Sequence, residues 1–328
     1  MNKIYCGHII GKQLSNSTSG GIGYAIAKHF ISLSYVVYGV GYSSDFKSLE
    51  YYRITSETDL YKITGTKYVK CNIDNDVVER IISDLYNGMV CFFGLPCGVA
   101  LVRKYIQNHV PNLEKNLFCV DLICHGPTYQ SILKTYVEEI ENKYSSRVVS
   151  LSNRYKNPKW EPTYLMVRFE NGKEYLRPLY DSDFGYALTV YTMESCYSCK
   201  IKGNNRFSDL TLGDGWGVPV NTCGYNEMGT SIIISHTSGG NDLMTQICGQ
   251  KDVVLDTLVD FNLEKNNPMY YRSAVKHSNY EKFKIEFEKN GLQKACKKCR
   301  TLKQSIRASV PLVLLKLIMH INRKKAGK

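Results

Sequence analysis

The sequence has no long apolar run at its start, no acidic residue after Glu288, and no internal repeat or low-complexity segment. Met1 to Ile10 contain one lysine and no extended apolar region, so we expect no secretory signal and a cytoplasmic location. Without an export signal, the twelve cysteines argue against a disulfide framework. In a reducing compartment, clustered thiols more often bind metal or carry out chemistry.

The positive charge of the chain is confined to its end. The net charge is +12, and all of this excess comes from the twelve lysines and arginines that follow Glu288. Residues 1 to 288 are formally neutral, so the sequence does not predict a basic groove across the body of the protein. We therefore expect no nucleic-acid partner.

The length and the pattern of the chain predict a large body and a distinct end. With 328 residues and 43% apolar content, we expect a body over residues 1–288 and a basic, partly amphipathic tail over 289–328. In the tail, Val310 to Ile321 is apolar but too short to span a bilayer. It could lie on an anionic membrane surface at the inner face, or dock onto the body or a partner subunit. If the tail docks onto a partner subunit, that subunit could be a second copy of this chain, so a homo-oligomer is possible.

A Ser-Gly-Gly stretch precedes a helical pattern near the start. Ser19, Gly20 and Gly21 lead into Ile22 to Phe30, where the apolar residues have helical spacing. Free N–H groups and the positive end of a helix dipole would suit a phosphate or pyrophosphate there. An ordinary N-cap with a flexible lead-in explains the same residues, so both interpretations stay open.

Strand and helix patterns alternate along the first half of the chain. Apolar runs of strand type and amphipathic runs of helical type follow one another, and a hairpin turn at Asn171-Gly172 joins strands of an antiparallel insertion at about 148–180. These patterns predict a mixed α/β (α+β) fold, with an open mixed sheet, flanking helices and a helical basic C-terminal section. The expected strands are 35–40, 51–56, 89–95, 117–123, 148–154, 164–169, 174–179, 209–212 and 231–236, with a turn into a further strand at 65–69. The expected helices are 22–30, 76–86, 99–107, 131–143, 183–192, 242–248 and 280–288.

Two cysteines come directly after buried strands. Cys97 follows the run 89–95 within Gly-Leu-Pro-Cys-Gly, and Cys124 follows the run 117–123 within Cys-His-Gly-Pro. Open α/β sheets bind ligands at this end of their strands, and two parallel strands would bring the two thiols side by side. Each cysteine could also be a small buried apolar residue.

A third cysteine pair lies on a tight turn. Cys196 and Cys199 form a C-x-x-C, and the strand-like run that follows, with its glycine-rich corner, would hold the turn rigidly. Cys97, Cys124, Cys196 and Cys199 together could ligate either zinc or a [4Fe–4S] cluster, and spacing alone does not separate the two. A second C-x-x-C, formed by Cys296 and Cys299, receives no role.

A loop in the antiparallel insertion carries a cation and an indole. Lys156, Lys159 and Trp160 could face a planar or anionic ligand, or they could be solvated loop residues.

Several motifs in series resemble one known family. The chain is similar, over roughly residues 15 to 217 and more loosely to about 290, to the coenzyme F-420 hydrogenase/dehydrogenase beta-subunit family. The resemblance implies a flavin-containing, iron–sulfur oxidoreductase that passes electrons between a [4Fe–4S] cluster, FAD and a partner. The partner would be the deazaflavin coenzyme, a ferredoxin or a reducible organic substrate. The motifs are Thr18-Ser19-Gly20-Gly21, Gly65-Thr66-Lys67-Tyr68-Val69, Gly94-Leu95-Pro96-Cys97, Asp121 to Gly126, Cys196-x-x-Cys199, and Ser208-Asp209-x-Thr211-x-Gly213-Asp214.

The resemblance also implies roles for individual residues. The four cysteines named above would be the cluster ligands, and Ser19, Gly20 and Gly21 would receive the flavin phosphates. Lys67 would offer a cation to a phosphate or to the reduced flavin ring. His125 could donate protons to flavin or substrate, or simply hydrogen-bond the backbone. Whether the flavin is FAD or FMN stays open.

The sequence departs from the family pattern in three places. Many relatives begin with a ferredoxin-like segment, whereas this chain begins almost directly at the Ser-Gly-Gly stretch, so we expect a separate ferredoxin-like or other redox donor and a small-molecule acceptor. Gly98 replaces the usual glutamine and Gly215 the usual aromatic residue. Relatives occur in surface-polysaccharide gene clusters, which makes a cell-envelope sugar precursor conceivable. The alternatives are a non-redox structural zinc protein and a membrane-docked interaction component.

Overall fold

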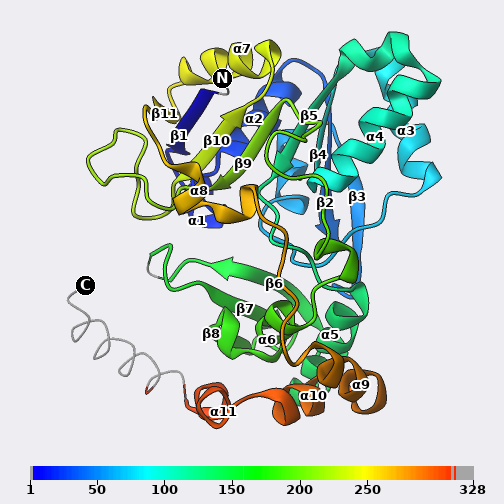
Figure 1. The fold of residues 1–328 in the computed structure, drawn as a ribbon, viewed down its shortest axis with the longest axis vertical. Helices are drawn as coiled ribbons and strands as arrows, with labels where there is room; N and C mark the ends of the chain where they lie inside the picture. Colours follow the sequence, from blue (N-terminus) through cyan, green and yellow to red (C-terminus); the bar gives the residue numbers. More distant parts are fainter. Residues whose placement is uncertain (1–2, 158, 312–313, 315–328) are drawn as a thin grey trace.

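The computed structural model describes residues 3–157, 159–311 and 314. Figure 1 shows a large sheet flanked by helices above a smaller sheet that has its own helices. The strands are β1 (Lys3–Ile9), β2 (Val36–Tyr42), β3 (Leu49–Ile54), β4 (Val90–Gly94), β5 (Leu117–Leu122), β6 (Val148–Tyr155), β7 (Tyr164–Phe169), β8 (Glu174–Pro178), β9 (Leu210–Asp214), β10 (Ser231–Ser235) and β11 (Val253–Thr257). The α-helices are α1 (Gln13–Asn16), α2 (Ile22–Ser32), α3 (Asn75–Asn87), α4 (Pro96–His109), α5 (Gln130–Tyr144), α6 (Asp183–Val190), α7 (Ser238–Cys248), α8 (Leu263–Asn266), α9 (Tyr280–Asn290), α10 (Leu292–Cys299) and α11 (Leu302–Ser309).

The large sheet is mixed, and its parallel part lies in the middle. Its eight strands follow the order β11-β1-β10-β9-β5-β4-β2-β3. Neighbours from β2 through β4 and β5 to β9 run parallel, whereas β3, β10, β1 and β11 each pair antiparallel with their neighbours. Since β4, β5 and β9 point the same way, the chain leaves all three at one edge of the sheet. The predicted mixed α/β fold is confirmed.

Helices cover both faces of the large sheet, which explains its uninterrupted apolar strands. Alternate residues of β4 and β5 belong to opposite cores, because successive side chains of a strand point to opposite faces. Cys91 and Val120 pack with α2 and α7 on one face. Phe92 and Cys119 pack with α3 and α4 on the other.

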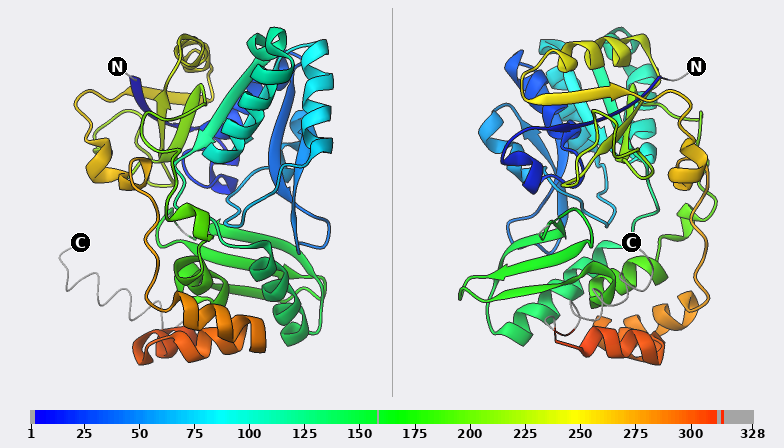
Figure 2. Two further views of the ribbon diagram at one scale, coloured as in Figure 1. Left: turned by 45° about the vertical axis from the view of Figure 1, so that its right-hand side comes forward. Right: turned by 90° about the vertical axis from the view of Figure 1, so that its left-hand side faces the viewer.

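The antiparallel strands β6, β7 and β8 form a separate three-stranded sheet. The sheet packs against α5, α6, α9 and α10 in one core, which includes Leu133, Leu165, Phe184, Phe283 and Leu292. Figure 2 shows the C-terminal helices α9 to α11 at the end of the molecule away from the large sheet. The second C-x-x-C lies on α10, and both of its thiols are buried in this core.

Sequence patterns missed several elements. The edge strand β11 and its neighbour β1 were not expected, and the turn at 65–69 leads only into an isolated bridge between Val69 and Thr128. Most of the apolar run Val310 to Ile321 lies outside the described residues. Within the described part of the chain, no helix is both long enough and apolar enough to cross a membrane.

Candidate functional site

The first two candidate ligands lie at the same edge of the large sheet. Strands β4 and β5 are parallel, with Gly94 opposite Asp121, so the chain leaves both strands at nearly the same height. Cys97 is in the first turn of α4 and is exposed, whereas Cys124 follows β5 directly and is partly buried. The expected side-by-side placement of the two strand ends is therefore present.

The Cys196–Cys199 turn packs onto the loop that follows Cys124. The Met193 N–H donates to the Pro127 carbonyl at 3.0 Å, and the Cys196 N–H donates to the Met193 carbonyl at 2.9 Å. Gly126 has a φ of +90°, and a Cβ added there would lie 2.6 Å from Thr192 Cγ2 and 3.1 Å from Cys196 Cβ. Glycine is therefore required at 126 by its backbone conformation and by the approach of the two loops.

Cys124 and Cys196 each lie within electrostatic reach of two of the other predicted cysteines. Burial raises the pKa of Cys124 to about 11, and the charges of Cys97 and Cys196 add to this rise. Burial also raises the pKa of Cys196, with contributions from Cys97 and Cys199. Across residues 3–157, 159–311 and 314, however, no three His, Cys, Asp or Glu side chains form a group that could hold a metal ion. The four thiols are thus neighbours that do not converge on a single ion.

Replacing Gly126 by alanine is expected to separate the two cysteine loops. Gly172, in the hairpin between β7 and β8, has a similar φ of +79° but nothing within 4 Å of an added Cβ. Alanine at either position should cost about 1–3 kcal/mol of folding stability through backbone strain. If the four cysteines hold an iron–sulfur cluster, only Gly126→Ala should also lower the iron retained by the purified protein, measured by colorimetric iron analysis. Equal iron content in the two variants would contradict this role of Gly126.

A lysine lies near three of the four cysteines. Lys202 Nζ donates to the Cys124 carbonyl at 2.8 Å and to the Met269 carbonyl at 2.7 Å. Burial lowers the pKa of Lys202, and the charges of Cys124, Cys199 and Cys196 oppose this. Sequence analysis missed Lys202, and no local pattern marks it because both of its acceptors are distant in sequence.

The Ser-Gly-Gly stretch is packed into the protein. Ser19 Oγ donates to the Thr230 carbonyl at 2.5 Å, and all three residues are buried. A Cβ on Gly20 would come within 2.5 Å of Ser231 N, so close packing against β10 is sufficient to require glycine there. Gly21 is the N-cap of α2 and has a left-handed backbone. A phosphate at this position would therefore bind to backbone N–H groups of the first turn of α2 and not to the Ser19 hydroxyl.

Lys67 is a partly buried cation that contacts backbone carbonyls. Its Nζ donates to the Thr64 carbonyl at 2.8 Å and to the Gly65 carbonyl at 3.2 Å, and lies 5.8 Å from the centre of the Tyr42 ring. Burial lowers the pKa of Lys67 to about 7. No acidic side chain pairs with it in the described part of the chain. The described neighbours of Lys67 Nζ are thus two backbone carbonyls and an aromatic ring.

His125 lies near an ion pair that joins the two sheets. Arg154 Nη1 of β6 and Asp214 Oδ2 at the end of β9 are 2.6 Å apart. Burial lowers the pKa of His125, while Asp214 acts to raise it and Lys202 and Arg154 act to lower it. The Nε and Nη2 atoms of Arg154 are buried and have no hydrogen-bond partner among the described residues. Sequence analysis missed Arg154, whose only signal is its place in a predicted strand.

The cation and indole side chains of the loop in the antiparallel insertion contact other residues of the protein. Lys156 is buried, and its Nζ donates to the Leu14 and Ser19 carbonyls at 2.6 and 2.7 Å. Lys159 forms an exposed ion pair with Glu227, and Trp160 stacks on Trp216 at 4.5 Å between ring centres. Lys156 thus stabilises the Ser-Gly-Gly stretch by donating to the Ser19 carbonyl.

The two glycines that depart from the family pattern have identifiable neighbours. A Cβ on Gly215 would lie 2.9 Å from the Thr230 carbonyl oxygen, and the Gly215 N–H donates to that oxygen at 2.7 Å. A larger residue at 215 therefore requires a different path of the chain. A Cβ on Gly98 would lie 3.1 Å from Ile73 Cδ1, so a side chain fits there only if Ile73 moves slightly.

Comparisons with known proteins show the family of the chain and its fold. The family model for the C terminus of the beta subunit of coenzyme F420 hydrogenase/dehydrogenase matches residues 88–261. Because the match spans more than half of the chain, the protein belongs to this family. No curated protein matches the chain.

One solved structure shares the fold over nearly the whole length. It is a chain of the F420-reducing [NiFe] hydrogenase complex from Methanosarcina barkeri, studied by xenon derivatization. The identity is 17% and the TM-score 0.58, over 91% of this chain and 90% of that one. At this identity the match establishes the fold alone, and the family assignment supports a redox enzyme in general terms.

Proposed function

We propose that this protein is a flavin-dependent iron–sulfur oxidoreductase, which transfers electrons between a [4Fe–4S] cluster, a flavin and an external donor or acceptor. The observation that carries the proposal is that three separate segments with the four cysteines meet: Cys97 and Cys124 follow neighbouring parallel strands, and an added Cβ on Gly126 would lie 3.1 Å from Cys196 Cβ. Soft thiolate ligands favour iron–sulfur clusters or zinc over hard cations such as magnesium. Membership in the hydrogenase/dehydrogenase family favours the cluster.

A [4Fe–4S] cluster makes a weaker demand on the convergence of the four thiols than a single ion does. A single zinc draws each of its sulfur ligands to about 2.3 Å from one centre. In a [4Fe–4S] cluster each cysteine can bind a different iron atom, so the sulfurs need not meet at a point. In our proposal Cys97 and Cys124 would hold the cluster at the sheet edge, and Cys196 and Cys199 would be its other two ligands.

The chain also offers buried groups that suit a flavin. Lys67 has no acidic partner in the described structure, and two nitrogen atoms of Arg154 lack acceptors there. Both cations could receive the phosphates or the ring of FAD, with FMN as the alternative. The first turn of α2, after Gly21, would bind a phosphate through its N–H groups. When bound, a flavin accepts a hydride from one partner and passes single electrons to a cluster.

His125 is our candidate for the proton donor. It follows Cys124 directly and lies within the electrostatic reach of Asp214 and Arg154. A histidine in this place could hold a proton beside the reacting group and exchange it with solvent. Lys202 would fix the Cys124 backbone, because it donates to the Cys124 carbonyl.

The electron donor and acceptor of the protein are also proposed here. The family assignment supports redox partners in general, and we propose a ferredoxin-like donor protein and a small-molecule acceptor. The deazaflavin coenzyme and a cell-envelope sugar precursor are both candidates for the acceptor. Peripheral membrane contact through the basic tail and a homo-oligomer also stay proposals.

Anaerobic purification and cofactor analysis test the proposal. We expect flavin absorbance, a broad iron–sulfur absorbance, and iron and sulfide in equal amounts. Protein that contains zinc in their place, with neither absorbance, would support the structural zinc alternative.

Lys67→Met is expected to weaken flavin binding by about tenfold or more at pH 7, because hydrogen bonds to charged groups are worth about 1.5–3 kcal/mol. In the free protein Lys67 loses its proton near pH 7, and a bound phosphate would favour the charged form. Binding should therefore take up a proton above pH 7, and the affinity should fall as the pH rises. Calorimetric titration with FAD in buffers of different ionisation enthalpy measures both effects.

The matched control is Lys159→Met, because Lys159 is an exposed lysine paired with Glu227. This variant should bind FAD with unchanged affinity and the same proton uptake. Unchanged proton uptake in Lys67→Met would exclude Lys67 from the flavin site.

A further inference from the structure

The last described helix leaves its apolar side chains uncovered. α11 contains no buried residue, and Leu302 and Ile306 are 79% and 52% exposed. These two residues are four positions apart, so they lie on the same side of the helix. Leu314, the next residue that the structure describes after Pro311, is 52% exposed. The apolar side of α11 is therefore not used by the core of the small sheet.

An ion pair and hydrogen bonds hold α11 against the small sheet. Arg307 Nε and Nη2 each donate to the Asp181 carboxylate at 3.0 Å. From β8, Arg177 Nη1 donates to the carbonyls of Arg307 and Val310 at 3.2 and 3.1 Å. Figure 2 shows α11 at the end of the molecule away from the large sheet. These contacts therefore present the exposed apolar residues of α11 on an outer surface of the protein.

The C-terminal section carries positive charge that the described structure only partly neutralises. Residues 289–328 contain twelve lysines and arginines and no acidic residue. Among those that are described, three form ion pairs with carboxylates, namely Lys298, Arg300 and Arg307. Four exposed lysines pair with no carboxylate among the described residues: Lys289, Lys294, Lys297 and Lys303. Lys303 follows Leu302 directly, so positive charge and apolar surface occur together on α11.

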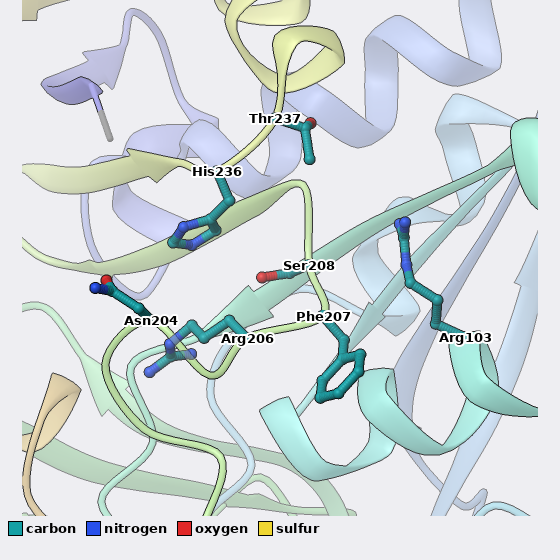
Figure 3. Close-up of a pocket in the computed structure, with 7 residues that line it drawn as sticks. All are labelled: Arg103, Asn204, Arg206, Phe207, Ser208, His236 and Thr237. Carbon is teal, nitrogen blue, oxygen red and sulfur yellow. The ribbon is translucent and has the colours of Figure 1, made fainter. Parts of the chain in front are cut away.

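The cavity beside the start of β9 illustrates the contrast with the body of the protein. Its volume is about 310 Å³, and Figure 3 shows Arg103 of α4 and Arg206 of the loop before β9 among its lining residues. Arg103 is paired with Asp209 at 2.5 Å, and Arg206 with Asp121 at 2.9 Å. Because residues 1–288 are formally neutral as well, the positive charge of the chain is concentrated in its C-terminal section.

We propose that α11 and the basic C-terminal section dock onto an anionic lipid bilayer. Leu302 and Ile306 would enter the interface of the bilayer, and the unpaired lysines would lie among its headgroups. Segments that combine an apolar side with lysines and arginines bind such surfaces through apolar burial and through attraction to anionic lipids. This inference rests on the peripheral membrane contact proposed above, and it does not depend on the cluster or the flavin.

The sequence and its charge favour lipid over a second copy of this chain as the occupant of this surface. The apolar run Val310 to Ile321 follows α11 directly, and four further basic residues follow that run. Two copies that met through this surface would bring together two C-terminal sections of like charge, with no acidic residue in either. An anionic bilayer offers both the opposite charge and an apolar interior.

Two double variants separate the apolar contribution from the charged one. Leu302→Gln/Ile306→Gln removes the apolar contact with the bilayer. Lys297→Glu/Lys303→Glu reverses two of the unpaired charges. All four side chains are exposed, so we expect both full-length variants to fold, which thermal unfolding checks.

The matched control is Val220→Gln/Val259→Gln. These two valines are 77% and 81% exposed and lie in the loops that follow β9 and β11. The control therefore removes a similar exposed apolar surface from the part of the molecule that contains the large sheet, and leaves the C-terminal section unchanged.

Co-sedimentation of the full chain with lipid vesicles measures the binding. The probes are vesicles of phosphatidylcholine alone and of phosphatidylcholine mixed with phosphatidylglycerol, each at low and at high salt. At low salt we expect the chain to bind the anionic vesicles at least about tenfold more tightly. Each C-terminal double variant should weaken this binding by about tenfold or more, and the valine control by less than about twofold. The lysine variant should also bind with less dependence on salt.

Three results would overturn the proposal. The first is an absence of binding, or binding that does not distinguish the two kinds of vesicle. The second is an equal loss of binding in the valine control and in Leu302→Gln/Ile306→Gln. The third is an oligomer, detected by sedimentation velocity without lipid, that Leu302→Gln/Ile306→Gln dissociates, because a second copy of the chain would then occupy this surface. Iron and flavin analysis of the same samples tests the cluster and the flavin separately.

Discussion

Cys124→Ser is expected to remove the proposed iron–sulfur cluster from the purified protein. A hydroxyl oxygen is a much harder ligand than a thiolate and does not replace it on iron. Even the loss of a group that only orients a metal ligand costs about 10–100-fold in metal affinity, so loss of the ligand itself should cost at least as much. Iron and sulfide per chain should fall about tenfold or more, and the visible absorbance of the cluster should disappear with them.

The control for this experiment is Cys248→Ser. Cys248 is an exposed free cysteine at the end of α7, away from the proposed ligands. It should retain full iron and sulfide, whereas serine at Cys97, Cys196 or Cys199 should repeat the loss seen for Cys124. If Cys124→Ser retained its iron while Cys248→Ser lost it, the ligand assignment would be wrong.

Asp121→Asn is expected to cost about 3–5 kcal/mol of unfolding free energy. The Asp121 carboxylate and the Arg206 guanidinium form an ion pair that is almost fully buried, and removal of one partner leaves an uncompensated buried charge. Burial raises the pKa of Asp121 although Arg206 acts to lower it, so desolvation of the carboxylate outweighs the attraction. Chemical denaturation followed by circular dichroism measures the change.

Two further variants make this prediction specific. Glu170→Gln breaks an exposed pair with Arg147, whose side chains are 58% and 80% exposed, and should cost less than about 1 kcal/mol. The double variant Asp121→Asn/Arg206→Met removes both charges and should lose less stability than Asp121→Asn alone. A cost for Asp121→Asn as small as that for Glu170→Gln would show that the pair is solvated.

Much of the fold could be predicted from local patterns. Buried parallel strands leave continuous apolar runs, such as Met89 to Leu95 and Leu117 to Ile123, and the structure places β4 and β5 within them. Asn171-Gly172 marks a hairpin that the structure contains between β7 and β8. The edge strand β11 and its neighbour β1 were missed because neither carries a clean alternation, and β1 gains its order from pairing with both β11 and β10.

The contacts between residues of the site were harder to predict than the places of its cysteines at strand ends and on a turn. Arg154 and Asp214 are sixty residues apart, and Lys202 reaches the Cys124 carbonyl across seventy-eight, so no spacing rule relates them. The role of α10 did have a signal. Leu292, Ala295, Cys296 and Cys299 follow helical spacing, and the structure buries all four. The second C-x-x-C is thus the apolar face of a helix in this structure.

The central claim is that four cysteines from three segments bind one [4Fe–4S] cluster. Electron paramagnetic resonance of the anaerobically purified, dithionite-reduced protein tests it most directly. We predict the signal of a reduced [4Fe–4S] cluster, integrating to about one spin per chain and absent from Cys124→Ser but retained in Cys248→Ser. A protein that gives no such signal and contains stoichiometric zinc would contradict the account.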